Sequence, residues 1–185
     1  MNDDNIALLH DGYHSRNNAT RVTAKDRMLP SLFDRLIDNE PDKKQEAVNN
    51  YMLSHSVLRQ SVLRDLQWLF NNINSEFEHD LTPFPAIRQS VYNFGLPPLS
   101  GKCISEIEWG DIQHRIISAI HIFEPRIIPD ELEVHCVSDT HSLTLYNTLS
   151  VEIKGFLWCV PRPLEFLFRS DIDLENGYFT IKEAG

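Results

Sequence analysis

Hydrophobic residues recur at helical spacing up to Phe123 and alternate with polar residues after Pro129. The clearest helical stripe lies within residues 58–73, where one apolar face is opposed by Arg and Gln side chains. The apolar members of this stripe are Leu58, Val62, Leu63, Leu66, Leu69, Phe70 and Ile73. Ser54 or Ser56 is placed to cap the helix. The stripe therefore predicts an amphipathic helix packed on a core.

Two further patterns predict one helix before this stripe and one after it. Residues 28–37 carry Pro30 in a first turn, which a helix tolerates, and one apolar face. That face is formed by Leu29, Leu32, Phe33 and Leu36. Such a piece docks either on its own core, which is the commoner outcome, or on another protein. Residues 112–123 repeat apolar side chains at three-and-four spacing, and Ser105 with Glu108 has capping-box spacing at the start of this helix.

The alternation after Pro129 predicts half-buried strands. Apolar and polar residues alternate in 131–136, 149–154 and 164–168, and Asn176-Gly177 is typical of a two-residue hairpin turn before a last strand. Gly155 suggests a bulge in the second of these strands. Helices followed by strands predict an α+β fold, with N-terminal helices packed on one face of a mixed or antiparallel sheet of three to four strands.

Length and charge limit the classes of protein that fit. A chain of 185 residues suits a single domain. Residues 1–27 lack periodicity and are expected to be a flexible tail, which leaves residues 28–185 as the folded domain. With 27 acidic and 17 basic residues the net charge is -10, which argues against a nucleic-acid partner.

Cysteine usage and hydropathy indicate a cytoplasmic protein. Cys103, Cys136 and Cys159 are odd in number, far apart and set among apolar residues, as expected of buried thiols in a reducing compartment. No apolar leader is visible, and no run approaches the roughly 18 apolar residues that a membrane span needs. Direct insertion into a membrane is not expected.

The tripeptide Glu124-Pro125-Arg126 stands where the last helix gives way to strands. Pro125 ends that helix at Phe123 and holds Glu124 and Arg126 at a fixed elbow. The two charges can pair with each other, Arg126 can cap the last helix carbonyls, or both can face a charged partner. An exposed pair contributes only about 0 to 1 kcal/mol, so loss of Arg126 is expected to leave folding nearly intact.

Candidate chemistry is sparse. The usual glycine-rich nucleotide loops and nucleophile elbows are missing from the sequence. Glu124 with Asp171 or Asp173 is the one carboxylate pair that could serve glycoside hydrolysis, although Arg126 favours an ionised Glu124. His135, Cys136 and His141 lie near each other, but neighbouring strand residues point to opposite faces, so neither a metal nor a cofactor is expected.

Five segments occur in the order and spacing of one known family. They are residues 31–36 (SLFDRL), 63–71 (LRDLQWLFN), 90–97 (SVYNFGLP), 123–126 (FEPR) and 173–177 (DLENG). With them the chain, from Met28 to Ile181, resembles the TssE family of type VI secretion baseplate subunits, which is similar to the phage T4 baseplate-wedge protein long labelled lysozyme-like.

The resemblance implies a structural wedge component and no enzyme. Glu124, Pro125 and Arg126 would contact neighbouring wedge subunits (TssF, TssG and TssK type), and the sheet would be extended by strands of sheath subunits (TssB and TssC type). Assembly would take place in the cytoplasm at the inner face of the bacterial inner membrane. Asn72, Ile73 and Asn176 depart from the family's pattern, so no contact role is carried onto them. A peptidoglycan-cleaving hydrolase is the alternative, as the older label suggests.

Overall fold

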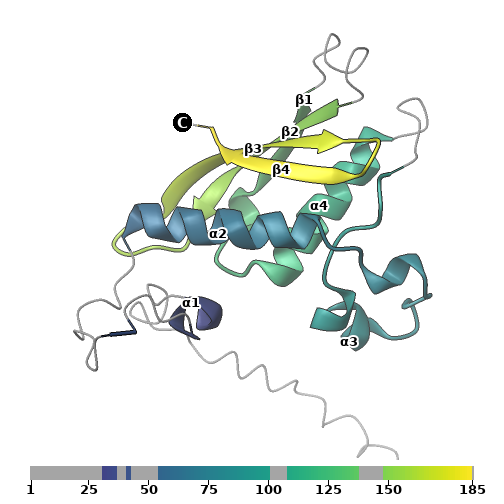
Figure 1. Cartoon of the computed structure of the whole chain (residues 1–185), viewed down its shortest axis with the longest axis horizontal. Helices are drawn as coiled ribbons and strands as arrows, with labels where there is room; N and C mark the ends of the chain where they lie inside the picture. Colours follow the sequence, from purple (N-terminus) through teal and green to yellow (C-terminus); the bar gives the residue numbers. More distant parts are fainter. Residues whose placement is uncertain (1–30, 37–40, 43–53, 101–107, 138–147, 185) are drawn as a thin grey trace, which may run out of the picture.

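Two long helices cover one face of a four-stranded antiparallel sheet in the computed structural model (Figure 1). The structure describes residues 31–36, 41–42, 54–100, 108–137 and 148–184. The α+β prediction is confirmed, and the sheet is antiparallel throughout, with its strands in chain order β1-β2-β3-β4. The predicted tail, residues 1–27, lies outside the described residues.

The helices largely follow the predicted stripes. They are α1 (Leu32–Leu36), α2 (His55–Phe70), the short α3 (Pro85–Arg88) and α4 (Trp109–Phe123). Ser54 caps α2 as predicted, because its hydroxyl accepts a hydrogen bond from the amide of Val57 at 3.4 Å. Ile73 lies beyond the end of α2 and is exposed, so its place in the buried stripe was wrong. The α4 helix has Glu108 as its N-cap residue, so it begins later than a capping box from Ser105 to Glu108 predicts, and Ser105 itself lies outside the described residues.

The strands are β1 (Glu133–Val137), β2 (Thr148–Leu157), β3 (Leu164–Asp173) and β4 (Tyr178–Glu183). Gly155 pairs with Phe166 within the regular ladder, so the predicted bulge was wrong. Its small size is needed because a Cβ there would lie 3.2 Å from the Glu131 carbonyl oxygen and from the Phe166 ring. Asp173 pairs with Tyr178, so the last hairpin loop spans residues 174–177 and is longer than the two residues predicted.

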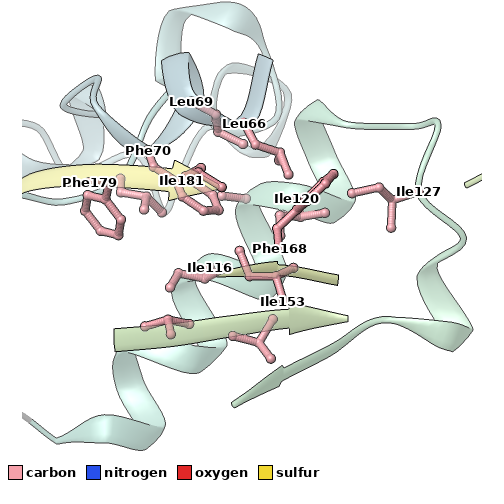
Figure 2. Close-up of a cluster of buried hydrophobic side chains, with 14 of the residues drawn as sticks. Leu66, Leu69, Phe70, Ile116, Ile120, Ile127, Ile153, Phe168, Phe179 and Ile181 are labelled. Carbon is pink, nitrogen blue, oxygen red and sulfur yellow. The ribbon is translucent and has the colours of Figure 1, made fainter. Parts of the chain in front are cut away.

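The core lies between the inner face of the sheet and the helices α2 and α4. Figure 2 shows Leu66, Leu69 and Phe70 of α2 and Ile116 and Ile120 of α4 turned toward side chains of β2, β3 and β4. The Phe70 and Phe179 rings pack with centroids 5.4 Å apart. Strand residues on the opposite face are largely polar. The alternation in the sequence thus corresponds to one buried and one solvated face.

Residues 71–100 form a loop region that includes α3 and leaves the end of α2 (Figure 1). Within this region an isolated bridge joins Ile73 to Leu96, and the buried side chain of Asn93 accepts a hydrogen bond from the Glu76 amide at 2.9 Å. Gly95 has φ +131°, and a Cβ there would lie 2.3 Å from the carbonyl oxygen of Asn72. The turn at this point therefore requires glycine.

Candidate functional site

The elbow after α4 is held between that helix and the sheet. Glu124 is the C-cap residue of α4, and its amide still donates to the Ile120 carbonyl at 2.8 Å. Its backbone has left the helical region before Pro125, as expected for a residue that precedes proline. Ile127 forms an isolated bridge with Leu157, and the Trp158 amide donates to the Arg126 carbonyl at 2.8 Å. The backbone of the elbow is therefore fixed on both sides.

Glu124 and Arg126 form a bidentate ion pair. The Arg126 Nε lies 2.6 Å from Glu124 Oε1, and its Nη2 lies 2.5 Å from Glu124 Oε2. The sequence left open whether these charges pair with each other, cap the helix or face a partner, and the structure shows Glu124 paired with Arg126. The expectation of an exposed pair was wrong, because Glu124 is only 4% exposed and the Arg126 side chain is 22% exposed.

The ion pair extends onto α2. The Nη1 of Arg126 donates to the Ser61 hydroxyl at 3.0 Å, and its Nη2 also donates to Asp65 Oδ2 at 2.5 Å. Asp65 is in turn bonded by Arg64, whose Nη2 lies 2.8 Å away. Three side chains thus meet around the guanidinium of Arg126, namely Ser61 and Asp65 of α2 and Glu124 of the elbow.

The short helix α1 completes this network. Asp34 accepts hydrogen bonds from the Ser61 hydroxyl at 2.9 Å, from the Ser31 hydroxyl at 2.7 Å and from Arg64. Ser61 therefore accepts from Arg126 while it donates to Asp34. We call the resulting group the elbow cluster, whose members are Asp34, Ser61, Arg64, Asp65, Glu124 and Arg126.

The elbow cluster contains three carboxylates and two guanidinium groups, so it carries a net charge of -1. Burial raises the pKa of Asp34, but hydrogen bonds from Arg64, Ser31 and Ser61 outweigh it and lower that pKa from 3.8 to about 2. Burial lowers the pKa of Arg126, while Glu124 and Asp65 raise it by more. Asp34 and Arg126 are therefore charged at neutral pH.

The hydrogen-bonding groups of this arrangement are largely satisfied within the chain. The Arg126 guanidinium already makes four hydrogen bonds within the chain, so it has no free pair of N–H groups for a partner carboxylate. Glu124 receives two of these bonds, so both oxygens of its carboxylate are engaged by Arg126. Asp171 accepts from the Ser150 hydroxyl at 2.7 Å, and Asp173 accepts from the Glu175 amide at 2.8 Å. Neither forms a described hydrogen bond with Glu124.

An apolar surface adjoins the elbow cluster. Phe33 packs edge-on against Trp68 with ring centroids 5.3 Å apart, and the Arg64 guanidinium lies over both rings. The segment contacts α2 of its own chain but does not dock on the core, because Phe33 and Trp68 are 49% and 44% exposed. Of the described residues of the expected face, only Phe33 makes this contact. Leu32 and Leu36 are 72% and 74% exposed, since Phe33 and Asp34 make the contacts with α2.

A separate cleft of about 400 Å³ lies between α4 and residues 74–97. Its charged lining includes Glu76, Arg88, Asp111 and Arg115, and Glu76 is ion-paired with Arg88 at 3.0 Å. Glu124 is not among the lining residues. The cleft therefore does not provide the carboxylate pair that hydrolysis at Glu124 would need.

Four members of the elbow cluster were not predicted as site residues, namely Asp34, Ser61, Arg64 and Asp65. Three of them lie in the segments 31–36 and 63–71, which carried the family resemblance, so those segments were the available signal. Ser61 lies outside these segments, and no sequence signal marked it.

No helix in the described part of the chain is long and apolar enough to cross a membrane. Among the described residues, His, Cys, Asp and Glu side chains form no group of three or more arranged to hold a metal.

Comparison with known proteins gives one match. Residues 56–162, more than half of the chain, match the sequence model of a family described as baseplate wedge protein gp25. The matched range runs from the start of α2 through the elbow and past the end of β2. No curated protein and no solved structure matches.

Proposed function

Because this chain belongs to the baseplate wedge protein gp25 family, we propose that it is the TssE-type wedge subunit of a type VI secretion baseplate. The family places it among the baseplate components of contractile injection systems. The single observation that carries the proposal is the match over residues 56–162, which includes Glu124-Pro125-Arg126 and half of the sheet. Its role is to hold other proteins in place and not to catalyse a reaction.

The first proposed contact is the elbow cluster, which would bind neighbouring wedge subunits of the TssF, TssG and TssK type. Glu124, Pro125 and Arg126 belong to this contact. Since the guanidinium of Arg126 is already engaged inside the chain, the elbow cluster acts as one rigid charged surface. Its net charge of -1 favours a cationic side chain on the partner.

The second proposed contact is the sheet, to which strands of TssB- and TssC-type sheath subunits would add. An exposed strand edge binds an extended segment through main-chain hydrogen bonds. Both contacts would form in the cytoplasm, at the inner face of the bacterial inner membrane. The hydrolase alternative is not favoured, because Glu124 is ion-paired with Arg126.

Co-purification tests the first contact. The protein is expressed with the wedge subunits encoded in the same gene cluster, as wild type and as Glu124→Gln and Arg126→Met variants. Wild type is expected to be retained, and both folded variants are expected to lose at least tenfold in retained complex. Glu124→Gln removes a negative charge that would attract the partner's cation, and Arg126→Met removes the side chain that holds Ser61, Asp65 and Glu124 in place. A tenfold loss corresponds to about 1.4 kcal/mol of binding free energy.

A stability-matched control is required, since Arg126 also holds the fold together. Ile172→Ala in β3 truncates a fully buried side chain at a cost of about 2 to 5 kcal/mol, which covers the cost expected for Arg126→Met, and it leaves the elbow cluster unchanged. Equal loss of complex in this control at equal thermal stability would assign the effect to folding. Failure of the wild type to bind any wedge subunit would refute the wedge proposal, and a muramidase assay would follow.

A further inference from the structure

The outer edge of β4 is covered by two side-chain amides of α2. Asn71 accepts from the Phe179 amide at 2.9 Å and donates to the Phe179 carbonyl at 3.0 Å. Gln67 accepts from the Ile181 amide at 2.9 Å and donates to the same Phe179 carbonyl. These main-chain groups point away from β3, and they are the groups that an added strand would use.

Further contacts run along the same edge. Arg59, two turns before Gln67, is ion-paired with Glu183 at 2.9 Å, so α2 follows β4 from Glu183 back to Phe179. Figure 1 shows α2 lying alongside this strand. Leu66 and Leu69 of the same helix are buried in the core, so α2 is anchored where it lies. A strand that added here would have to displace the helix. The edge of β4 is closed.

The opposite edge of the sheet differs. β1 pairs with β2 from Glu133 to Val137, and among the described residues no hydrogen bond reaches its other side. In an antiparallel ladder about half of a strand's amides and carbonyls point away from its partner. The side chains of Glu133 and His135 are exposed on the polar face, whereas Val134 is buried. β1 therefore presents a strand edge with one apolar and one polar side.

The apolar side of this edge is supported by α4, which packs against β1. Three apolar side chains at this border, Ile117, Leu132 and Cys136, are only partly buried against the core. A strand added beside β1 would extend the ladder and cover these side chains with its own inward-facing residues. The matching segment is an extended one in which apolar residues alternate with polar ones.

We propose that an extended segment of a sheath subunit adds to the sheet at β1, and that Gln67 and Asn71 exclude it from β4. This inference rests on the proposed sheath contact and names the place and direction of that contact. The two amides act as a substitute for a fifth strand at β4. Because only the edge of β1 can then take an added strand, the sheath grows from this protein in one orientation.

Crosslinking from the two edges tests this assignment. A photoreactive residue is placed at His135 in β1 or at Thr180 in β4, since both side chains are exposed on the polar face of an edge strand. The full chain is then mixed with the TssB–TssC-type sheath complex from the same gene cluster. We expect at least a tenfold higher crosslinked fraction from position 135 than from position 180.

Amide hydrogen exchange supplies the second measurement. In the free protein the Phe179 and Ile181 amides should exchange slowly, while the outward amides of β1 should exchange fast and become at least tenfold slower on binding. Asn71→Leu should speed exchange at Phe179, which checks that the side-chain amide provides the protection. Slow exchange along the outer side of β1 in the free protein would overturn the proposal, because that edge would already be occupied by this chain.

The outcomes separate the edge assignment from the proposed function. Binding with crosslinks at position 180 would overturn the assignment to β1 and leave the sheath contact standing. Binding with crosslinks at neither position would overturn strand addition. Lack of any binding to the sheath complex would refute the sheath contact itself, while the wedge contact would still be judged by co-purification.

Discussion

Replacing Arg126 with Met is expected to lower the free energy of unfolding by about 3 kcal/mol. Methionine keeps most of the length of the side chain and removes its charge. Glu124, at 4% exposure, would then be a buried carboxylate without its cation. Removing one partner of a buried ion pair costs about 3 to 5 kcal/mol. Loss of the hydrogen bond to Ser61 adds about 1 kcal/mol.

Two features of the site lower the expected value below that sum. The side chains of Arg126 and Asp65 are 22% and 24% exposed, so water screens part of their attraction. Glu124 also keeps the hydrogen bond from the Arg126 backbone amide at 3.2 Å. At roughly 2 to 4 °C per kcal/mol for a chain of this size, the melting temperature should fall by about 6 to 12 °C.

Thermal and urea unfolding of the full chain measure the effect, and two further variants identify its cause. Arg88→Met breaks the more exposed pair with Glu76 and should cost about 0 to 1 kcal/mol. The double variant Glu124→Gln, Arg126→Met removes the uncompensated charge and should recover at least about 1 kcal/mol relative to Arg126→Met alone. The reasoning is refuted if Arg126→Met costs no more than Arg88→Met, or if the double variant is less stable than Arg126→Met.

Three further predictions concern the acid response, the core and the glycines. The pKa of Asp34 is lowered to about 2, so the contribution of this carboxylate to stability is complete above pH 3.8 and is lost as the pH falls toward 2. Asp34→Asn should therefore flatten the pH dependence of the free energy of unfolding between these values. An unchanged slope would contradict this expectation. Ile116→Asp places a charge at a site that is 1% exposed and should abolish the cooperative unfolding transition, and a normal transition by circular dichroism would count against the assigned core. Gly95→Ala should destabilise the protein by several kcal/mol, because the added Cβ would meet the Asn72 carbonyl oxygen. Gly110→Ala, in the first turn of α4, places its Cβ where no atom lies within 4 Å and should stabilise the protein by about 0.5 to 1 kcal/mol. Equal melting temperatures for the two variants would refute this comparison.

The local elements of this protein were determined by its sequence. The apolar stripe of α2, the stop of α4 at Phe123 and the alternation in β2 each follow from side-chain periodicity or from the geometry of proline, which act within a few residues. Predictions failed where a neighbour distant in sequence decided the outcome. Gly155 pairs with Phe166 in a regular ladder, and the close approach of Glu131 and Phe166 to the position of a Cβ there is not visible in local sequence.

The two proposed binding surfaces were decided by the tertiary structure. The sequence placed Glu124 beside Arg126, but Asp34, Ser61 and Asp65 joined them only because α1, α2 and the elbow come together in the fold. The two edge strands likewise look similar as sequence patterns. Packing of α2 along β4 brings Gln67 and Asn71 onto the main chain of one edge, since side chains one turn apart on a helix can meet successive outward groups of a strand. Burial and hydrogen bonding between distant segments therefore set which charges are paired and which strand edge is covered by α2, and neither property is encoded in local periodicity.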